Sequence, residues 1–182
     1  MQLFTPSLVI LVSTTVLLAS CGEETVDDPD TSDGPSVCTT GEPVEISPEI
    51  LIRTAESQAT EFSVIFLSLQ CDEVPDELLF RVDLTNHTGD IAGFDHDLDR
   101  SARLVTDTGK IVSAGLSYEI LSADEHHPSG ILRVPNEFGG QPLVDCTVGQ
   151  LTLELEGVAT PPGERLSFEW EGEVLDGLRS CP

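Results

Sequence analysis

The chain is poor in basic residues. Its 182 residues include 33 Asp and Glu but only 8 Lys and Arg, so the formal net charge is −25 at pH 7. Such a charge repels phosphate backbones, which excludes nucleic acid and bare anionic lipid as expected partners. Hydrophobic residues still make up 39% of the chain, too large a share for a wholly disordered protein. We therefore expect a folded domain with an acidic surface.

Sequence motifs of common catalytic sites are also missing. The chain contains no GxSxG nucleophile turn and no glycine-rich phosphate loop. Pairs of carboxylates carry no information about glycosidase chemistry here, because acidic residues are so abundant. No CxxC spacing occurs either, which disfavours a structural zinc site. We expect a non-catalytic protein without a resident cofactor.

The N-terminus has no charged side chain before Glu23 and contains an apolar run from Leu8 to Leu18. This run is too short to cross a bilayer as a helix, but it suits the hydrophobic region of a signal peptide. It ends in Leu18-Ala19-Ser20-Cys21-Gly22, which resembles the lipobox of exported prokaryotic lipoproteins. No Lys or Arg precedes the run, which departs from the usual signal peptide.

The lipobox resemblance implies cleavage before Cys21 and transfer of a diacylglyceryl group to its thiol, with acyl chains such as palmitate. It places the protein on the extracytoplasmic side of the cell membrane, anchored by lipid. The absence of a twin-arginine pair favours the general secretory route. The alternative is an ordinary signal peptide, in which Cys21 is a chance residue.

Composition divides the chain into three parts. Residues 1–20 are expected to be the lipoprotein signal peptide, 21–45 an acidic flexible tether, and 46–182 a β-sandwich domain. Residues 22–45 hold eight acids and no base. Such a segment buries too little apolar area to offset its chain entropy, so we expect it to be extended. An acidic partner-binding tail is the alternative interpretation of the same segment.

Four cysteines remain when Cys21 is set aside. An even number in an exported chain predicts two disulfides. Three pairings are possible, and spacing does not choose among them. We favour a bond between the two outer cysteines, which would tie the ends of the domain, and a second bond between the two inner ones. The four residues are Cys38, Cys71, Cys146 and Cys181.

The domain has the period-2 hydrophobic pattern of half-buried strands. The pattern is clear in 78–85, 151–156 and 165–171. Residues 62–69 are apolar on both faces, as in an interior strand or a strand that carries a bulge. Turn residues are expected at 107–109, 128–130 and 161–163. Residues 48–58 are expected to form a short helix, and further strands are expected at 102–106, 116–121 and 130–134. The fold class is therefore all-β, an antiparallel immunoglobulin-like β-sandwich.

This order of strands resembles, in layout, the immunoglobulin-like (telokin-like) domains of exported lipoproteins. The shared features are Asn86 at a strand end followed by Gly89, the segment 104–109, and a Pro-Gly turn at 162–163 before the last apolar strand. The resemblance implies a binding or scaffolding module. It assigns no ligand, because fold alone does not determine function.

All four histidines fall in expected loops, next to acidic residues. Imidazole and carboxylate groups are ligands that Zn²⁺ and Cu²⁺ accept. The aspartates of 95–99 have the spacing of the first ligands of a calcium loop, but the turn glycine and the bidentate glutamate of that motif are absent. The candidate metal ligands are His87, His96, His126, His127, Asp95 and Asp97. Exposed loop histidines without a metal are the alternative.

Together these observations favour a membrane-anchored lipoprotein with a non-catalytic binding or scaffolding domain. Its expected partners are the lipid membrane, through acylated Cys21, and another envelope protein or a surface polymer. The second hypothesis is a metal-binding lipoprotein that uses the loop histidines and aspartates for copper, zinc or calcium.

Overall fold

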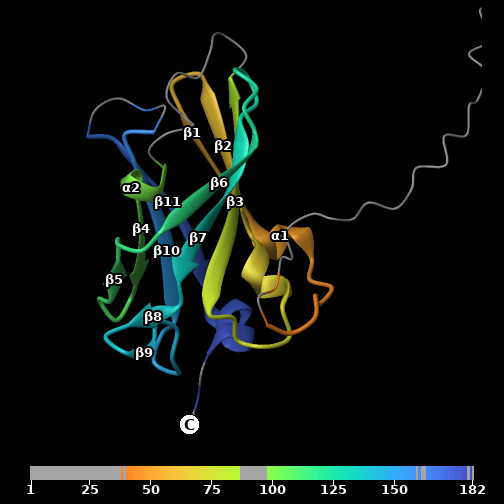
Figure 1. Ribbon diagram of the computed structural model, residues 1–182, viewed down its shortest axis with the longest axis vertical. Helices are drawn as coiled ribbons and strands as arrows, with labels where there is room; N and C mark the ends of the chain where they lie inside the picture. The colour runs from red at the N-terminus through yellow and green to blue at the C-terminus, as the bar shows by residue number, and fades with distance from the viewer. Residues whose placement is uncertain are drawn as a thin grey trace, which may run out of the picture. The chain divides into compact units, whose positions relative to one another are not determined.

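Alternating apolar residues build two antiparallel sheets (Figure 1). The computed structural model describes Cys38, 40–86, 98–158, Thr160, 163–179 and Cys181. The five-stranded sheet has the order β1 (Ile52–Ser57), β2 (Thr60–Phe66), β3 (Glu77–Asn86), β7 (Ser129–Pro135) and β6 (Ser117–Ser122). The four-stranded sheet has the order β11 (Arg165–Glu171), β10 (Gln150–Glu156), β4 (Ala102–Thr106) and β5 (Ile111–Val112).

Short elements complete the fold. A small hairpin consists of β8 (Glu137–Phe138) and β9 (Gln141–Pro142). The helical turns are α1 (Pro48–Leu51), α2 (Leu98–Ser101) and the 3₁₀ turns η1 (Leu67–Gln70) and η2 (Gly172–Leu178). Within the described part of the chain, no helix has the length and apolar character needed to cross a bilayer.

The core lies between the two sheets. Every second residue of β3, β10 and β11 is buried there, as the period-2 pattern predicts. Phe66 and Phe80 stack with ring centroids 4.4 Å apart, and Trp170 from the other sheet meets Phe66 edge-on at 5.2 Å. The fully buried Trp170 donates its indole N–H to the carbonyl of Leu51, at 3.2 Å. The predicted all-β antiparallel sandwich is confirmed.

The expected helix at 48–58 is wrong beyond its first turn. Only α1 is helical, and the following residues form strand β1, which pairs with β2 from Ile52 opposite Ile65 to Ser57 opposite Thr60. Gln58 adopts a φ of 54°, in the left-handed region, and so permits the two-residue turn between these strands. Pairing with a neighbouring strand outweighs the local helical pattern.

The expected strand at 62–69 ends early. Strand β2 stops at Phe66, and the chain continues as η1 beside β3. There the buried Ser68 hydroxyl accepts the N–H of Leu79 at 2.8 Å and donates to the carbonyl of Glu77 at 3.3 Å. A side chain thus takes over the hydrogen bonding that a further strand residue would supply.

The turn expected at 128–130 is also misplaced. Ser129 and Gly130 are paired residues of β7. Gly130 is required for space, since a Cβ at this position would collide with the Tyr118 hydroxyl and the Glu119 carbonyl of β6. The turn at 107–109 is confirmed, with Gly109 at a φ of 84° between β4 and β5.

The favoured cysteine pairing is wrong, although the prediction of two disulfides is confirmed. Cys38 bonds to Cys71 and Cys146 bonds to Cys181, with Cα atoms 5.6 Å and 5.3 Å apart. Each bond links one flanking segment of the domain to a nearby loop, at sequence separations of 33 and 35 residues. The two ends of the domain are not joined to each other, because each finds its partner cysteine in the loop against which it packs.

Candidate ligand-binding cavity

A cavity of about 500 Å³ lies where the segment before α1 meets η1 and η2. This volume falls within the range of pockets that take small organic molecules. Asp72 and Glu173 are its only ionisable lining side chains among the described residues. Most of the lining is aliphatic, and consists of Val44, Ile46, Ile50, Leu69, Val174 and Leu178.

The first wall of the cavity is the segment that leads into α1. It is held to the chain around Cys71 by backbone hydrogen bonds, from Val44 N–H to the Gln70 carbonyl and from Asp72 N–H to the Glu42 carbonyl. The Cys38–Cys71 disulfide fixes the same region, and Cys71 itself lines the cavity. These contacts hold Cys38 and residues 40–45 to residues 70–74 of the folded domain, although their composition predicts that they belong to the tether.

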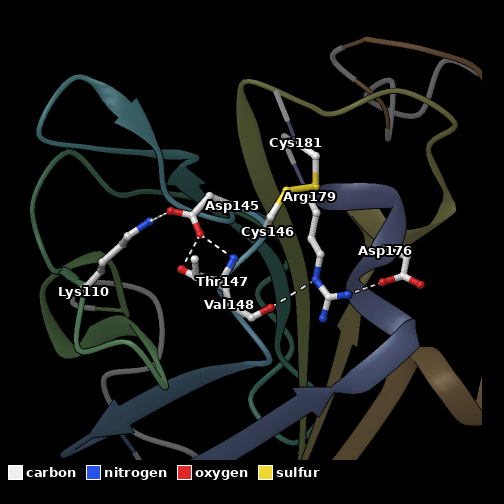
Figure 2. Close-up of a disulfide and its surroundings, with 8 residues drawn as sticks. All are labelled: Lys110, Asp145, Cys146, Thr147, Val148, Asp176, Arg179 and Cys181. Atoms are coloured by element: carbon white, nitrogen blue, oxygen red, sulfur yellow. Dashed lines mark hydrogen bonds and ion pairs between the residues drawn. A yellow bond between two sulfur atoms is a disulfide. The ribbon is translucent and has the colours of Figure 1, made fainter.

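The second wall consists of residues of η2, the turn near the C-terminus (Figure 1). Its first residue, Gly172, donates its N–H to the Gly149 carbonyl at 2.9 Å. Arg179, which follows η2, donates to the Val148 carbonyl at 3.1 Å and pairs with Asp176. Figure 2 shows this arginine beside the Cys146–Cys181 disulfide, which ties the same segment to the chain before β10. Each wall of the cavity is thus held by its own disulfide.

Next to the second disulfide, Lys110 joins two loops (Figure 2). It pairs with the Asp145 carboxylate at 2.7 Å and donates to the Leu143 carbonyl at 2.9 Å. The same carboxylate accepts hydrogen bonds from the Thr147 hydroxyl and N–H. Lys110 and Thr147 together hold the pKa of Asp145 well below its ordinary value. This cluster fixes the loop that carries Cys146.

The described histidines lie elsewhere, in the loop between β6 and β7. The Asp124 carboxylate accepts the backbone N–H groups of His126 and His127, both at 2.8 Å, which lowers its pKa. Both histidines are exposed, and the His126 carbonyl accepts the N–H of Asn86 at the end of β3. Aspartate in this position stabilises the turn locally.

The metal-site prediction is only partly covered by the structure. Among the residues that it describes, no group of three or more His, Cys, Asp and Glu is arranged to hold a metal ion. His87, His96, Asp95 and Asp97 lie outside the described residues. The convergence of the four histidines on a metal therefore stays an alternative hypothesis, and the lipidation of Cys21, which also lies outside the described residues, stays a prediction.

Sequence reasoning missed the cavity residues. Two signals were available: Val44 and Ile46 are apolar residues in an otherwise acidic stretch, and Val174 and Leu178 have the spacing of one helical face. Neither signal shows that the two segments meet, since they are far apart in the chain. This chain matches no family model, no curated protein and no solved structure.

Proposed function

We propose that the protein is a membrane-anchored, extracytoplasmic lipoprotein whose β-sandwich is a non-catalytic module that binds an apolar ligand in the cavity between η1 and η2. The cavity carries this proposal, since aliphatic side chains make up most of its lining. The lipobox supports the anchoring. Cys38 bonds to Cys71, and Cys71 lines the cavity.

Binding suits this cavity better than catalysis. Its buried hydroxyl, on Ser68, is engaged by the backbone of β3 and so serves the fold. Nucleophilic catalysis needs a nucleophile within hydrogen-bond reach of a base. The described lining offers aliphatic contacts and two carboxylates, which select a ligand by shape and charge.

The anchoring is tested by comparing the wild-type chain with Cys21→Ser in a bacterial host. We expect the wild type in the membrane fraction, with a mass that shows cleavage before Cys21 and added acyl chains, and the variant without acyl chains. Equal distribution of both proteins in the soluble fraction, or an unmodified Cys21 in the wild type, would contradict the proposal.

The cavity is tested by filling it. A Cβ at Gly177, which lines the cavity, meets no atom within 4 Å, so a larger side chain can be accommodated there. In the full chain carrying Cys21→Ser, we expect Gly177→Leu to weaken binding of the neutral fluorophore N-phenyl-1-naphthylamine at least about tenfold, because it occupies the apolar volume. Gly177→Ala, the matched control, leaves most of the volume open and keeps the affinity within about twofold. Equal affinity in both variants would overturn the assignment.

A further inference from the structure

We infer that the ligand of this cavity is a small organic cation, with an apolar body that fills the cavity and an ammonium-type group at its mouth. This inference rests on the proposed function and adds the chemical class of the ligand. Its basis is the combination of an aliphatic interior with carboxylates on both walls.

The aliphatic lining of the cavity favours a ligand with an apolar body. Leu69 and Leu178 are almost fully buried at the base of the cavity, while Ile50 and Val44 remain partly exposed around it. Exposed aliphatic side chains around a hollow gain free energy when an apolar group covers them, in proportion to the area removed from water. A purely ionic ligand would leave this surface wet.

The carboxylates that line the cavity favour a ligand with a positive charge. Asp72 comes from the turn after η1 and Glu173 from η2, so the two lining carboxylates stand on different walls. The segments that form the walls carry further acids, which are Glu42, Glu45, Glu49, Glu73 and Asp76. The negative charge of these carboxylates attracts a cation to this region and repels an anion.

The basic residues of the wall segments do not cancel this charge at the mouth. Arg53 donates to the Glu169 carbonyl of the other sheet at 2.6 Å and lies 5.7 Å from the centre of the Trp170 ring. Its second nitrogen donates to the backbone carbonyls of Glu49, Ile50 and Ile52, so the guanidinium is engaged by the backbone. Arg179 is held by Asp176 and by the carbonyls of Val148 and Gly172. Neither arginine lines the cavity.

The test uses three compounds with one apolar body and different charge: 4-phenylbutylammonium, 4-phenylbutanol and 4-phenylbutyrate. Each displaces the neutral fluorophore from the full Cys21→Ser chain at low salt. We expect the cation to displace it at about one tenth of the concentration that the alcohol needs, and the anion to be the weakest. The preference should shrink at high salt, because screening weakens attraction between exposed charges.

The double variant Asp72→Asn/Glu173→Gln should bring the cation within about twofold of the alcohol and leave the alcohol unchanged. Asn keeps the acceptor oxygen that the Glu42 N–H contacts at 2.6 Å, so the wall keeps its hydrogen bond. The matched control Glu61→Gln/Glu125→Gln removes the same charge from exposed positions at the other end of β3 and should preserve the preference.

The outcomes separate the two proposals. If the fluorophore binds but the three compounds displace it equally, or the control variant loses the preference as well, the cavity stands and the cationic ligand is wrong. Stronger displacement by the anion would likewise overturn it. If the fluorophore does not bind the cavity at all, the proposed function itself fails.

Discussion

The two ends of the sandwich are built differently. At the cavity end, where β2 stops and β3 begins, three helical turns and two disulfides hold the flanking segments. At the histidine end, the 58–59 turn and the 123–128 loop each join adjacent strands, and Asp124 stabilises the backbone of the second. The two disulfides thus hold the segments that line the cavity, and no such bond is found at the described part of the histidine end.

The largest loss of stability is expected when the core next to the cavity end is opened. Trp170→Ala should lower the free energy of unfolding by about 3–5 kcal/mol, because it opens a large void among buried aromatic rings. It also leaves the Leu51 carbonyl at the end of α1 without its indole donor. Urea unfolding followed by circular dichroism measures the change, and Trp170→Phe, which keeps most of the volume, should cost less. A loss below about 1 kcal/mol in Trp170→Ala would contradict the packing described.

Removing either disulfide should weaken the same end. The loops closed by the two bonds differ by only two residues in sequence separation, 33 against 35. The chain-entropy model therefore predicts nearly equal losses, up to about 4 kcal/mol each. Cys38→Ala/Cys71→Ala and Cys146→Ala/Cys181→Ala are compared by urea unfolding and by fluorophore binding. Both should also bind less, since each loses one wall; unchanged binding in either would contradict the role of that bond.

Measuring stability as a function of pH tests the ion pair between Lys110 and Asp145. Its lowered pKa means that the ionised carboxylate is favoured in the folded state, so its contribution is present above the ordinary value of 3.8 and is lost as pH falls below it. Asp145→Asn keeps an oxygen acceptor for Thr147 but loses the charge that pairs with Lys110. We expect the variant to have a lower Tm than the wild type at pH 7, and the difference to shrink in acid. A constant difference across the series would be the contrary result.

The smallest effect is expected at the histidine end. His126 and His127 are exposed, and within the described residues no metal-binding cluster forms around them. We expect His126→Ala/His127→Ala to leave the response of the Tm to excess Zn²⁺ or Cu²⁺ unchanged in the full Cys21→Ser chain, because these two exposed imidazoles belong to no group of ligands among the described residues. A rise in Tm that disappears in His126→Ala/His127→Ala would instead support the metal-binding hypothesis.

The strands could be predicted where one face of the strand is buried and the other is exposed to solvent. The segments 78–85, 151–156 and 165–171 alternate for this reason, and each is a strand in the structure. The prediction was wrong where contacts with a neighbouring strand determine the conformation of the segment. Residues 52–57 became β1 through pairing with β2, and β2 stopped at Phe66 because the Ser68 side chain bonds to β3.

The candidate site was much less predictable. Its two walls come from segments on either side of the sandwich domain, and neither has a binding motif. The cysteines indicated that covalent links exist, but their spacing suits several pairings. Only the packing of each flanking segment against its neighbouring loop selects Cys38 with Cys71 and Cys146 with Cys181.

The sequence by itself determined the acidic charge, the all-β class and the presence of two disulfides, since composition and period-2 burial are local properties of the chain. The tertiary structure alone decided which cysteines meet and where an apolar hollow faces carboxylates from two walls. Such features depend on contacts between residues far apart in the chain, and loop closure brings those residues together only when the sheets pack.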